Sequence, residues 1–303
     1  MGHSIKDIIK KPSLLFLTLG HRGFLNWIDD ETYIKIAYRI RMGKKLNLDL
    51  PVTYSEKLQW LKLYDRKQIY TTMVDKYEVK EYVSKIIGDR YVIPTYNVWN
   101  NVEDINFDLL PDQFVLKCTH DSGGLVICKD KSRLDITATK KKLNACLNHN
   151  FFYAQREWPY KDVKPRIIAE PYVEDKITKE LRDYKFFCFN GEVKAMFIAS
   201  DRGSVEETKF DFYDQNFNHL PFTNGHLNAD IPPQKPEQFE LMKKLAAQLS
   251  CGIPQLRVDF YEANGQVYFG ELTFFHWSGM TPFEPEEWDN KFGEWITLPS
   301  KDE

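Results

Sequence analysis

The segment 256–283 carries the residues whose types and spacing say most about chemistry. It reads LRVDFYEANGQVYFGELTFFHWSGMTPF and places Arg257, Asp259 and Glu271 on the two strands of one predicted hairpin. Two carboxylates a few ångströms apart repel each other unless a cation or a shared proton lies between them. Mg²⁺ takes oxygen ligands from one or two side chains and completes its coordination with phosphate oxygens. The segment therefore predicts a site for magnesium and phosphate.

The register of this hairpin decides whether the two carboxylates meet. A two-residue turn at 264–265 would pair Asp259 with Gly270 and leave Glu271 on the opposite face of the hairpin. A loop one residue longer, with glycine in the left-handed position, would leave Asp259 diagonal to Glu271 on the same face. We therefore predict the three-residue loop or an equivalent bulge.

A structural Arg–Glu pair across the hairpin is the competing interpretation, and such pairs often have little net value. The surrounding apolar side chains argue against it, because charges placed among them without a ligand would be costly. These apolar residues are Phe260, Phe269, Leu272, Phe274 and Phe275.

A glycine-containing loop lies between two apolar strands in FVLKCTHDSGGLVICKD, residues 114–130. Lys117 is on the incoming strand, and Ser122, Gly123 and Gly124 are at the tip. Glycines allow backbone N–H groups to approach an anion closely, and a nearby lysine adds a positive charge. The segment is compatible with a phosphate-binding loop, but taken alone it favours an ordinary β-hairpin with a flexible turn.

The strand IIAEPYVED, residues 167–175, delivers Glu170, Tyr172, Val173 and Asp175 in close succession. A carboxylate can accept from an adenine amino group, a backbone N–H can meet the ring, and an acidic residue can bind ribose hydroxyls. The alternative is a solvated strand end without a ligand.

Composition limits the class of protein. The chain has 303 residues, a net charge of −3 and 43% hydrophobic residues, so it can bury a core but has no overall field that would attract nucleic acid. No apolar run reaches the roughly 18 residues of a membrane helix, so we expect no transmembrane segment. The five cysteines have no metal-ligand spacing. We expect a reduced, cytoplasmic protein.

Periodicity predicts helices in the first part of the chain. Tyr33, Ile36, Ala37 and Ile40 recur at helical spacing. We expect Ser55 to cap a second helix, and a third helix to run over about residues 72–87, ended by Gly88 in a left-handed cap. Short strands are predicted at 91–93 and 114–116.

The second half is predicted to be mostly strand. Residues 183–189 and 193–199 flank an Asn-Gly turn, and 210–213 form a further strand. One helix interrupts, between Pro236 and Gly252, before the long hairpin. This order indicates an α+β protein with largely antiparallel sheets.

Taken in this order, the three segments resemble the motifs of ATP-grasp enzymes, and over residues 72–283 those of D-alanine–D-alanine ligases. More narrowly, DYKFFCFNGEVKAMF and ELTFFHWSGMTPF resemble the TupA-like ATP-grasp family, over about residues 45–300. The resemblance implies an α+β, ATP-grasp fold in which two α+β lobes sandwich ATP, preceded by a mainly helical N-terminal region. It divides the chain into 1–70, 71–168 with the glycine-rich loop, and 169–303 with the magnesium-binding hairpin.

The resemblance also implies roles for the matching residues. The nucleotide-binding set is Lys76, Lys117, Ser122, Gly123, Gly124, Glu170, Tyr172, Val173 and Asp175. The magnesium set is Asp259, Glu271 and Thr273, where Thr273 replaces the usual asparagine. The catalytic pair is Arg257, which would steady an acyl phosphate, and Arg202, for which Lys185 and Lys209 are rivals. Ser278 and Gly279 would bind the substrate.

The function implied is ATP-dependent carboxylate–amine ligation with ATP and Mg²⁺, through an acyl phosphate. The family is associated with bacterial surface-polysaccharide loci, which implies a uronic acid or other sugar acid and an amine or amino acid as substrates, and peripheral association with polysaccharide machinery. Aromatic side chains could stack on such a sugar or simply fill the core: Tyr153, Trp158, Tyr160, Trp277 and Trp288. The alternatives are a sugar-modifying transferase (a kinase or a glycosyltransferase) and a non-catalytic nucleotide-binding protein.

Overall fold

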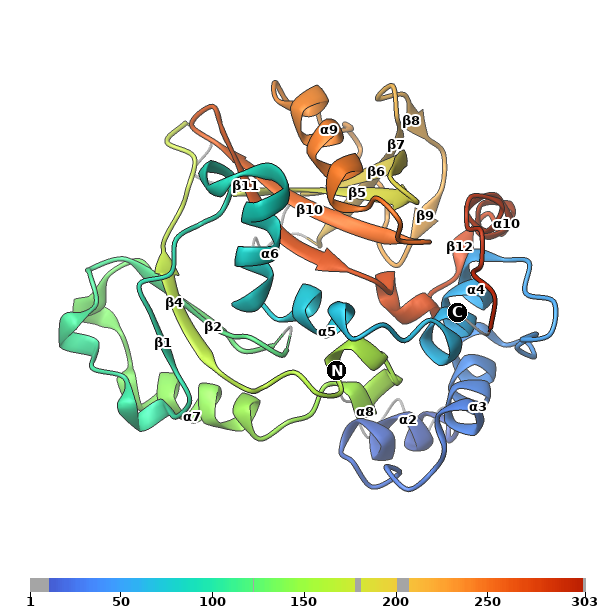
Figure 1. Cartoon of the computed structure of the whole chain (residues 1–303), viewed down its shortest axis with the longest axis horizontal. Helices are drawn as coiled ribbons and strands as arrows, with labels where there is room; N and C mark the ends of the chain where they lie inside the picture. Colours follow the sequence, from blue (N-terminus) through green and yellow to red (C-terminus); the bar gives the residue numbers. More distant parts are fainter. Residues whose placement is uncertain (1–10, 122, 178–180, 201–206, 302–303) are drawn as a thin grey trace.

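The computed structural model describes residues 11–121, 123–177, 181–200 and 207–301, and this part of the chain has an α+β fold. Its two larger sheets are antiparallel throughout. Helices α2, α3 and α4 gather at one end of the molecule, and α9 lies over the larger sheet (Figure 1). The predicted fold class is confirmed.

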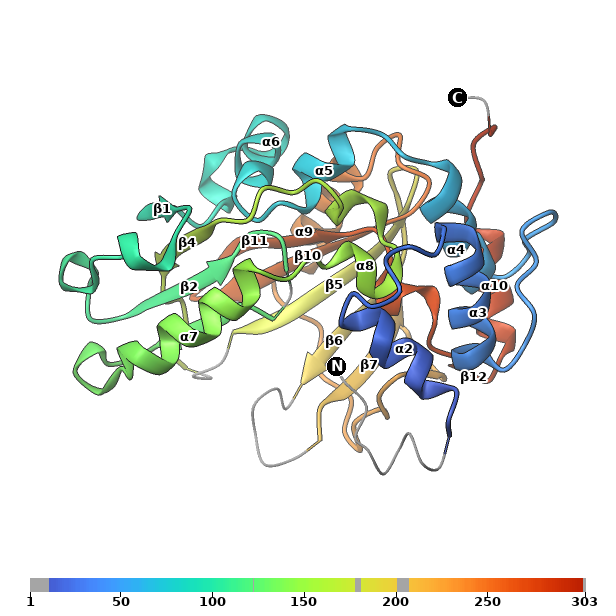
Figure 2. The same ribbon diagram turned by 90° about the horizontal axis from the view of Figure 1, so that it is seen from below.

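The four-stranded sheet has the order β1-β4-β2-β3. Its strands are β1 (Asn97–Trp99), β2 (Phe114–Cys118), β3 (Leu125–Cys128) and β4 (Ile167–Pro171). Helix α7 (Ile136–Leu147) runs along this sheet (Figure 2), and the two share a small apolar core. The 168/169 boundary of the proposed lobes falls inside β4, which pairs with β2 over its whole length.

The six-stranded sheet has the order β11-β10-β5-β6-β7-β8. Its strands are β5 (Arg182–Phe189), β6 (Glu192–Ser200), β7 (Lys209–Asp214), β8 (His219–Leu220), β10 (Leu256–Ala263) and β11 (Gln266–Thr273). A separate pair consists of β9 (Thr223–Asn224) and β12 (Phe283–Glu284). The strands predicted in the second half are present, and Asn190 and Gly191 both have positive φ in the turn that joins β5 to β6.

Helix α9 (Phe239–Leu249) buries the apolar stripe that its sequence predicts. The buried residues are Phe239, Met242, Leu245, Ala246 and Leu249. Phe239 packs on Phe186 of β5, with ring centroids 6.0 Å apart. The helix thus covers the face of the larger sheet that points away from the four-stranded sheet.

The N-terminal helices are α2 (Leu14–His21), α3 (Asp30–Met42) and α4 (Tyr54–Tyr64). Helix α3 begins where the Asp29 carboxylate accepts the Thr32 N–H and ends at Gly43 in a left-handed conformation. Its buried face is rotated from the predicted one, because Ile34 is fully buried and Ile36 is 37% exposed.

Helix α4 is capped by Thr53 and not by Ser55, which corrects the prediction. Thr53 and Glu56 form a reciprocal capping box at the helix N-terminus. Ser55 lies inside the first turn, where its N–H and hydroxyl both donate to Asp289, at 2.8 and 2.9 Å. This residue therefore joins α4 to α10 (Glu287–Glu294).

The helix predicted over residues 72–87 is two helices, α5 (Ile69–Val74) and α6 (Glu78–Ile87). Asp75 breaks the run, since its carboxylate accepts the N–H groups of Tyr77 and Glu78. The predicted left-handed cap at Gly88 is wrong, because its φ of 100° and ψ of 150° lie outside that region. The strand predicted at 91–93 is also wrong, since a short 3-10 helix, η1 (Asp89–Tyr91), precedes a loop.

Short helices complete the described chain. They are α8 (Phe152–Gln155) and the 3-10 helices η2 (Val102–Asp104), η3 (Phe107–Leu109), η4 (Lys131–Arg133), η5 (Trp158–Tyr160) and η6 (His276–Gly279). None of the helices in the described ranges is long and apolar enough to span a lipid bilayer.

One large apolar core joins the N-terminal helices to the six-stranded sheet. Residues of α3 and α4, such as Tyr33 and Leu58, belong to the same buried cluster as Phe187 of β5. Many of the aromatic side chains lie in this core: Trp288, for example, is buried and stacks on Phe222 with ring centroids 4.6 Å apart. A sugar-stacking role for Trp288 is therefore wrong.

Candidate functional site

Asp259 and Glu271 stand directly opposite each other on the β10–β11 hairpin. The turn has only two residues, Asn264 and Gly265, so the predicted three-residue loop is wrong. The predicted equivalent, a bulge, is present: Phe260 pairs with Phe269, and Gly270 is the extra residue before Glu271. The bulge restores the register that brings the two carboxylates onto one face.

Glycine is required at this bulge by close packing. A Cβ at position 270 would lie 3.0 Å from the backbone oxygen of Asp259 and 3.2 Å from the ring of Tyr261. The strand backbone cannot move away easily, so the half-buried Tyr261 ring and the bulge would both have to adjust. The glycine is therefore part of the device that aligns the site.

Arg257 binds both carboxylates. Its Nε and Nη2 donate to the two oxygens of Asp259 at 2.7 and 2.8 Å, and Nη2 also donates to Glu271 Oε1 and Thr273 Oγ1, each at 2.9 Å. Lys185 of β5 forms an ion pair with Asp259 and lies 3.4 Å from Asp183. Two buried cations thus compensate the fully buried Asp259.

These charges fix the protonation states of the site. Burial tends to raise the pKa of Glu271, but the positive charges of Lys185, Arg257 and Lys76 outweigh it and hold the pKa at about 2. Burial acts to lower the pKa of Arg257, and Asp259 and Glu271 reverse this effect and raise it above its ordinary value. Both groups therefore stay ionised at neutral pH.

The four-stranded sheet contributes a second set of charges across the cleft. The buried Glu170 of β4 receives Lys117 on one oxygen and Lys80 on the other, each at 2.5 Å. Burial tends to raise the pKa of Glu170, and the two lysines overcome this and lower it. The carboxylate that was predicted to accept from adenine is therefore engaged with two lysines in this structure.

Sequence reasoning missed Lys80, whose Nζ also donates to Ile93 O at 2.9 Å and Thr95 Oγ1 at 2.6 Å. The available signal was its position on the same segment as Lys76, one helical turn later in the sequence. Lys185 was only a rival for the role given to Arg202, yet it lies beside Asp259. Arg202 itself lies outside the described residues, and Lys209, half-buried in β7, does not line the cleft.

Lys76 reaches the glycine-containing loop. Its Nζ donates to the backbone oxygen of Asp121, and its N–H donates to Thr119 O at 3.0 Å. The Asp121 carboxylate in turn accepts the Gly123 N–H at 2.7 Å. Gly124 packs so closely that a Cβ there would lie 2.5 Å from the sulfurs of both Cys118 and Cys146. Ser122 lies outside the described residues.

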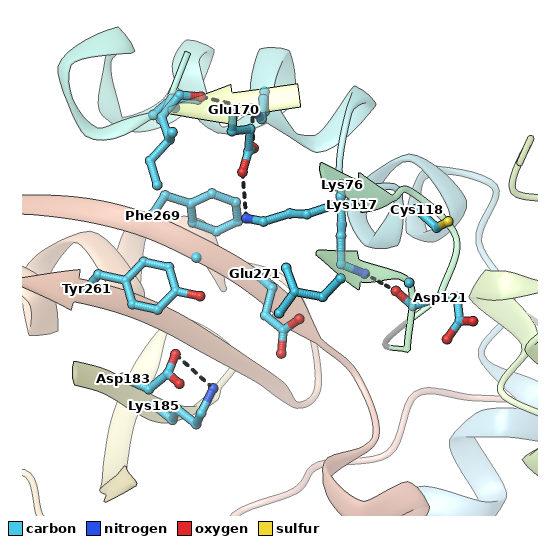
Figure 3. A pocket seen from close by; sticks show the side chains of 16 residues that line it. Lys76, Lys117, Cys118, Asp121, Glu170, Asp183, Lys185, Tyr261, Phe269 and Glu271 are labelled. Atoms are coloured by element: carbon cyan, nitrogen blue, oxygen red, sulfur yellow. Dashed lines mark hydrogen bonds and ion pairs between the residues drawn. The ribbon is translucent and has the colours of Figure 1, made fainter. Parts of the chain in front are cut away.

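A cleft between the two sheets brings these groups together (Figure 3). One hollow, of about 230 Å³, is lined by charged residues, which include Lys76, Lys117, Glu170, Lys185 and Glu271. An adjoining hollow of about 330 Å³ is more apolar. Its lining includes Ile93, Val115, Ile127, Tyr172, Val173 and Tyr261. Since ligand sites measure roughly 300–1,000 Å³, the two together have the size and polarity gradient of a nucleotide site.

Among the predicted site residues that the structure describes, seven lie outside the cleft lining: Gly123, Asp175, Arg257, Asp259, Thr273, Ser278 and Gly279. Asp175 accepts the Asn264 N–H at 2.8 Å and so supports the hairpin turn. Ser278 and Gly279 are buried in η6, where their backbone oxygens accept from the side chain of Gln59. Direct nucleotide binding by Asp175 and substrate binding by Ser278 and Gly279 stay predictions.

Glu271 presents its carboxylate to the cleft and Thr273 adds a hydroxyl beside it, whereas both oxygens of the fully buried Asp259 already accept from cations. The Glu271 side chain is 41% exposed, and Thr273 Oγ1 lies 3.3 Å from its Oε1. Within the described ranges, no cluster of three or more His, Cys, Asp or Glu side chains could hold a metal by itself. Mg²⁺ needs no such cluster, because it is typically bound by one or two carboxylates with phosphate oxygens and water. Asp259, Glu271 and Thr273 stay the predicted magnesium ligands, and Asp259 would have to release Arg257 or Lys185 from one oxygen in order to bind.

Comparison with solved structures finds ligases to which this chain is similar. The D-alanine–D-alanine ligase of Bacillus anthracis complexed with ATP is 19% identical, with a TM-score of 0.42, and the alignment covers 74% of this chain and 63% of that chain. The D-alanine–D-alanine ligase of Helicobacter pylori is 15% identical (TM-score 0.41, covering 81% and 69%). The ATP-grasp ligase PsnB with its minimal precursor is 9% identical (TM-score 0.42, covering 85% and 69%).

This chain therefore spans less than two thirds of the Bacillus anthracis ligase. No curated protein matches the sequence. The family comparison, by contrast, matches residues 56–297 to the family described as TupA-like ATPgrasp, which is well over half of the chain. The protein belongs to the TupA-like ATP-grasp family.

Proposed function

We propose that this protein is an ATP-dependent carboxylate–amine ligase that works through an acyl phosphate. The observation that carries the proposal is the position of Glu271, which lines the charged end of a nucleotide-sized cleft and is joined through the buried Arg257 to the opposed carboxylate of Asp259. Lys76 and Lys117 approach the same cleft from the opposite side (Figure 3). Such an array of fixed cations suits the transfer of a phosphoryl group.

The reaction divides into two steps. A substrate carboxylate oxygen attacks the γ-phosphorus of ATP, the bond from that phosphorus to the β,γ-bridging oxygen breaks, and ADP leaves. An amine then attacks the acyl carbon, inorganic phosphate leaves with one of the former carboxylate oxygens, and the amine loses a proton as the amide forms.

The chain contributes mainly position and charge to these steps. Lys76, Lys117 and Lys185 would offset the negative charge of the phosphate groups, and Arg257 would hold the magnesium ligands in place. Mg²⁺, bound by Asp259, Glu271 and Thr273, would supply further positive charge on the phosphate oxygens. No side-chain nucleophile is needed.

For the substrates we propose a uronic acid or other sugar acid and an amine or amino acid, in the synthesis of a bacterial surface polysaccharide. What supports this choice is the family membership together with an acyl-phosphate chemistry that requires a carboxylate and an amine. A sugar kinase, a glycosyltransferase and a nucleotide-binding protein without turnover are the other outcomes of the test below.

The test is ADP release and product mass with ATP, Mg²⁺, a panel of uronic acids and a panel of amines. We expect ADP release that needs both an acid and an amine, with a product whose mass is that of the two substrates minus water. ADP release with a hydroxyl acceptor alone would indicate a kinase, and consumption of a sugar nucleotide would indicate a glycosyltransferase. Thermal stabilisation by ATP–Mg²⁺ without turnover on either panel would indicate nucleotide binding alone. Each of these three results would overturn the proposal.

A further inference from the structure

The turn that follows the metal-binding hairpin has an unusual backbone. Trp277, Ser278 and Gly279 have φ values of 49°, 58° and 61°, so that three successive residues are in the left-handed region. Two of them carry side chains, for which this region is sparsely populated. Such a backbone persists only where its surroundings hold it, and it is typical of functional sites.

Helix α4 holds this turn from inside the protein. Lys62 is fully buried, and its Nζ donates to Ser278 O at 2.8 Å and to Ser278 Oγ at 2.7 Å. Gln59, also fully buried, donates from Nε2 to the backbone oxygens of Ser278 and Gly279, each at 3.0 Å. A Cβ at position 279 would lie 2.6 Å from Gln59 Nε2, so the turn and the helix fit closely.

The same lysine links two further parts of the chain. Its Nζ donates to Gln59 Oε1 at 2.9 Å and to Gln155 O at 3.2 Å. Glu157 is buried nearby, and its negative charge acts on Lys62. A lysine is rarely buried without such compensation, because an ammonium group loses its hydration there. The nucleotide and metal residues do not use this charge, so it requires another explanation.

His276, the first residue of η6, contacts Arg257 directly. Arg257 Nη1 donates to His276 Nδ1 at 2.9 Å, while His276 Nε2 lies 3.1 Å from Asn224 Oδ1. The Asn224 amide nitrogen is used on Thr281 O and Pro282 O, each at 3.0 Å, so its side-chain oxygen is the acceptor. Only a neutral imidazole with its proton on Nε2 satisfies both neighbours. His276 therefore accepts a hydrogen bond from Nη1 of Arg257, while Nε and Nη2 of the same guanidinium donate to Asp259 and Glu271.

We propose that Lys62 and His276 are positioning residues of the ligase centre. Lys62, from the N-terminal helices, holds η6 in its left-handed conformation, and η6 presents His276 to Arg257. The orientation of Arg257 toward Asp259 and Glu271 then depends on a residue of α4. This inference rests on the proposed function for its kinetic consequence, but the link from Lys62 to His276 can be measured without any substrate.

The test compares Lys62→Met with Lys57→Met. Lys57 lies on the same helix and likewise donates to two backbone oxygens, Gly293 O and Ile296 O, each at 2.8 Å. These acceptors belong to α10 and the segment after it, and not to η6. We expect K62M to change the ring ¹⁵N shifts of His276 and to lower kcat about 10- to 100-fold with little change in KM for ATP, as misplacement of a reacting group does. K57M should leave the His276 signals and kcat unchanged.

His276 has a matched pair of variants of its own. In His276→Asn the side-chain oxygen replaces Nδ1 as an acceptor for Arg257, whereas His276→Phe keeps the ring but provides no acceptor. We expect H276N to retain more of kcat than H276F. If K62M does not fold, Gln59→Met removes the amide donors to the same turn and serves in its place.

Unchanged His276 signals in a folded K62M or Q59M protein would overturn the proposal, as would equal kcat losses in K62M and K57M. Wild-type protein that turns over no acid and amine would instead refute the proposed function, and the His276 signals would still decide whether α4 positions this histidine.

Discussion

Gly270 places Glu271 directly opposite Asp259, because it supplies the one extra residue that corrects the register of a two-residue hairpin. Without this bulge, Asp259 would face position 270 and the carboxylate of Glu271 would point to the other side of the sheet. The alignment of the two carboxylates therefore depends on a glycine that has no side chain of its own.

Substitution of Gly270 should lower the rate of the reaction without abolishing nucleotide binding. In Gly270→Ala, the new Cβ meets the Asp259 backbone oxygen at 3.0 Å, so the bulge must shift. Displacement of a catalytic group by a fraction of an ångström to 1 Å costs about 10- to 100-fold in rate. We expect kcat to fall within this range while ADP affinity, measured by calorimetry, stays within about threefold. A variant with wild-type kcat would show that the bulge does not set the alignment.

The two carboxylates should differ in their effect on stability. Asp259→Asn leaves the buried Arg257 and Lys185 short of a counter-charge, which typically costs about 3 kcal/mol of the free energy of unfolding. Glu271→Gln removes a carboxylate that is 41% exposed, for which about 1 kcal/mol or less is expected.

Denaturant unfolding of the two variants measures this difference directly. Both should lose activity, by about 100-fold or more, because each removes a predicted magnesium ligand. Equal losses of stability, or full activity in either variant, would contradict the assigned roles.

Lys80 should contribute to ATP affinity through Glu170. In Lys80→Met the Glu170 carboxylate keeps only Lys117, which is then held more firmly away from the phosphates. Since a hydrogen bond to a charged group contributes about 1.5–3 kcal/mol, we expect ATP to bind roughly 10- to 100-fold more weakly. Lys85→Met is the matched control, because Lys85 pairs with Glu81 on the surface of the same helix. Isothermal calorimetry with equal ATP affinities for both variants would count against this role.

Acid should destabilise the protein through its buried histidines. Burial, together with the charges of Arg257 and Lys185, holds the pKa of His276 well below its usual range, and burial also lowers the pKa of His120. Below about pH 6.5 the unfolded chain therefore binds more protons than the native protein, and the free energy of unfolding falls as the pH is lowered.

The variant His276→Phe removes one of these two contributions and should flatten the slope between pH 6.5 and 5 by up to about 1.4 kcal/mol per pH unit. The measurement is a urea unfolding series across this pH range. A slope identical to that of the wild type would mean that His276 is not held neutral in the folded protein.

Local sequence patterns were sufficient for much of the fold. The alternation of 183–189, the Asn-Gly turn and the stripe of α9 correctly predicted elements that carry the larger sheet and its cover. They failed where a side chain competes with the backbone. Asp75 ends α5 by accepting backbone N–H groups, and so a single predicted helix became two.

The site was predictable where its residues share one hairpin and not where they come from distant segments. The pairing of Asp259 with Glu271 followed from spacing, given a bulge. The contacts of Lys80 with Glu170 and of Lys62 with Ser278 join residues 90 and 216 positions apart, and no local pattern specifies such partners. Lys62 is fully buried and Lys80 is partly buried, whereas the hydration of a lysine ammonium group favours the protein surface, so the sequence alone predicts an exposed position for both.

The central claim is that a substrate carboxylate is activated as an acyl phosphate at the Arg257 centre. The most direct measurement uses an acid substrate with ¹⁸O in both carboxylate oxygens, together with ATP, Mg²⁺ and the amine. If the carboxylate attacks the γ-phosphorus and the amine then displaces phosphate, one ¹⁸O atom must appear in each inorganic phosphate formed and one must remain in the amide. Amide formation with inorganic phosphate free of ¹⁸O would contradict the account.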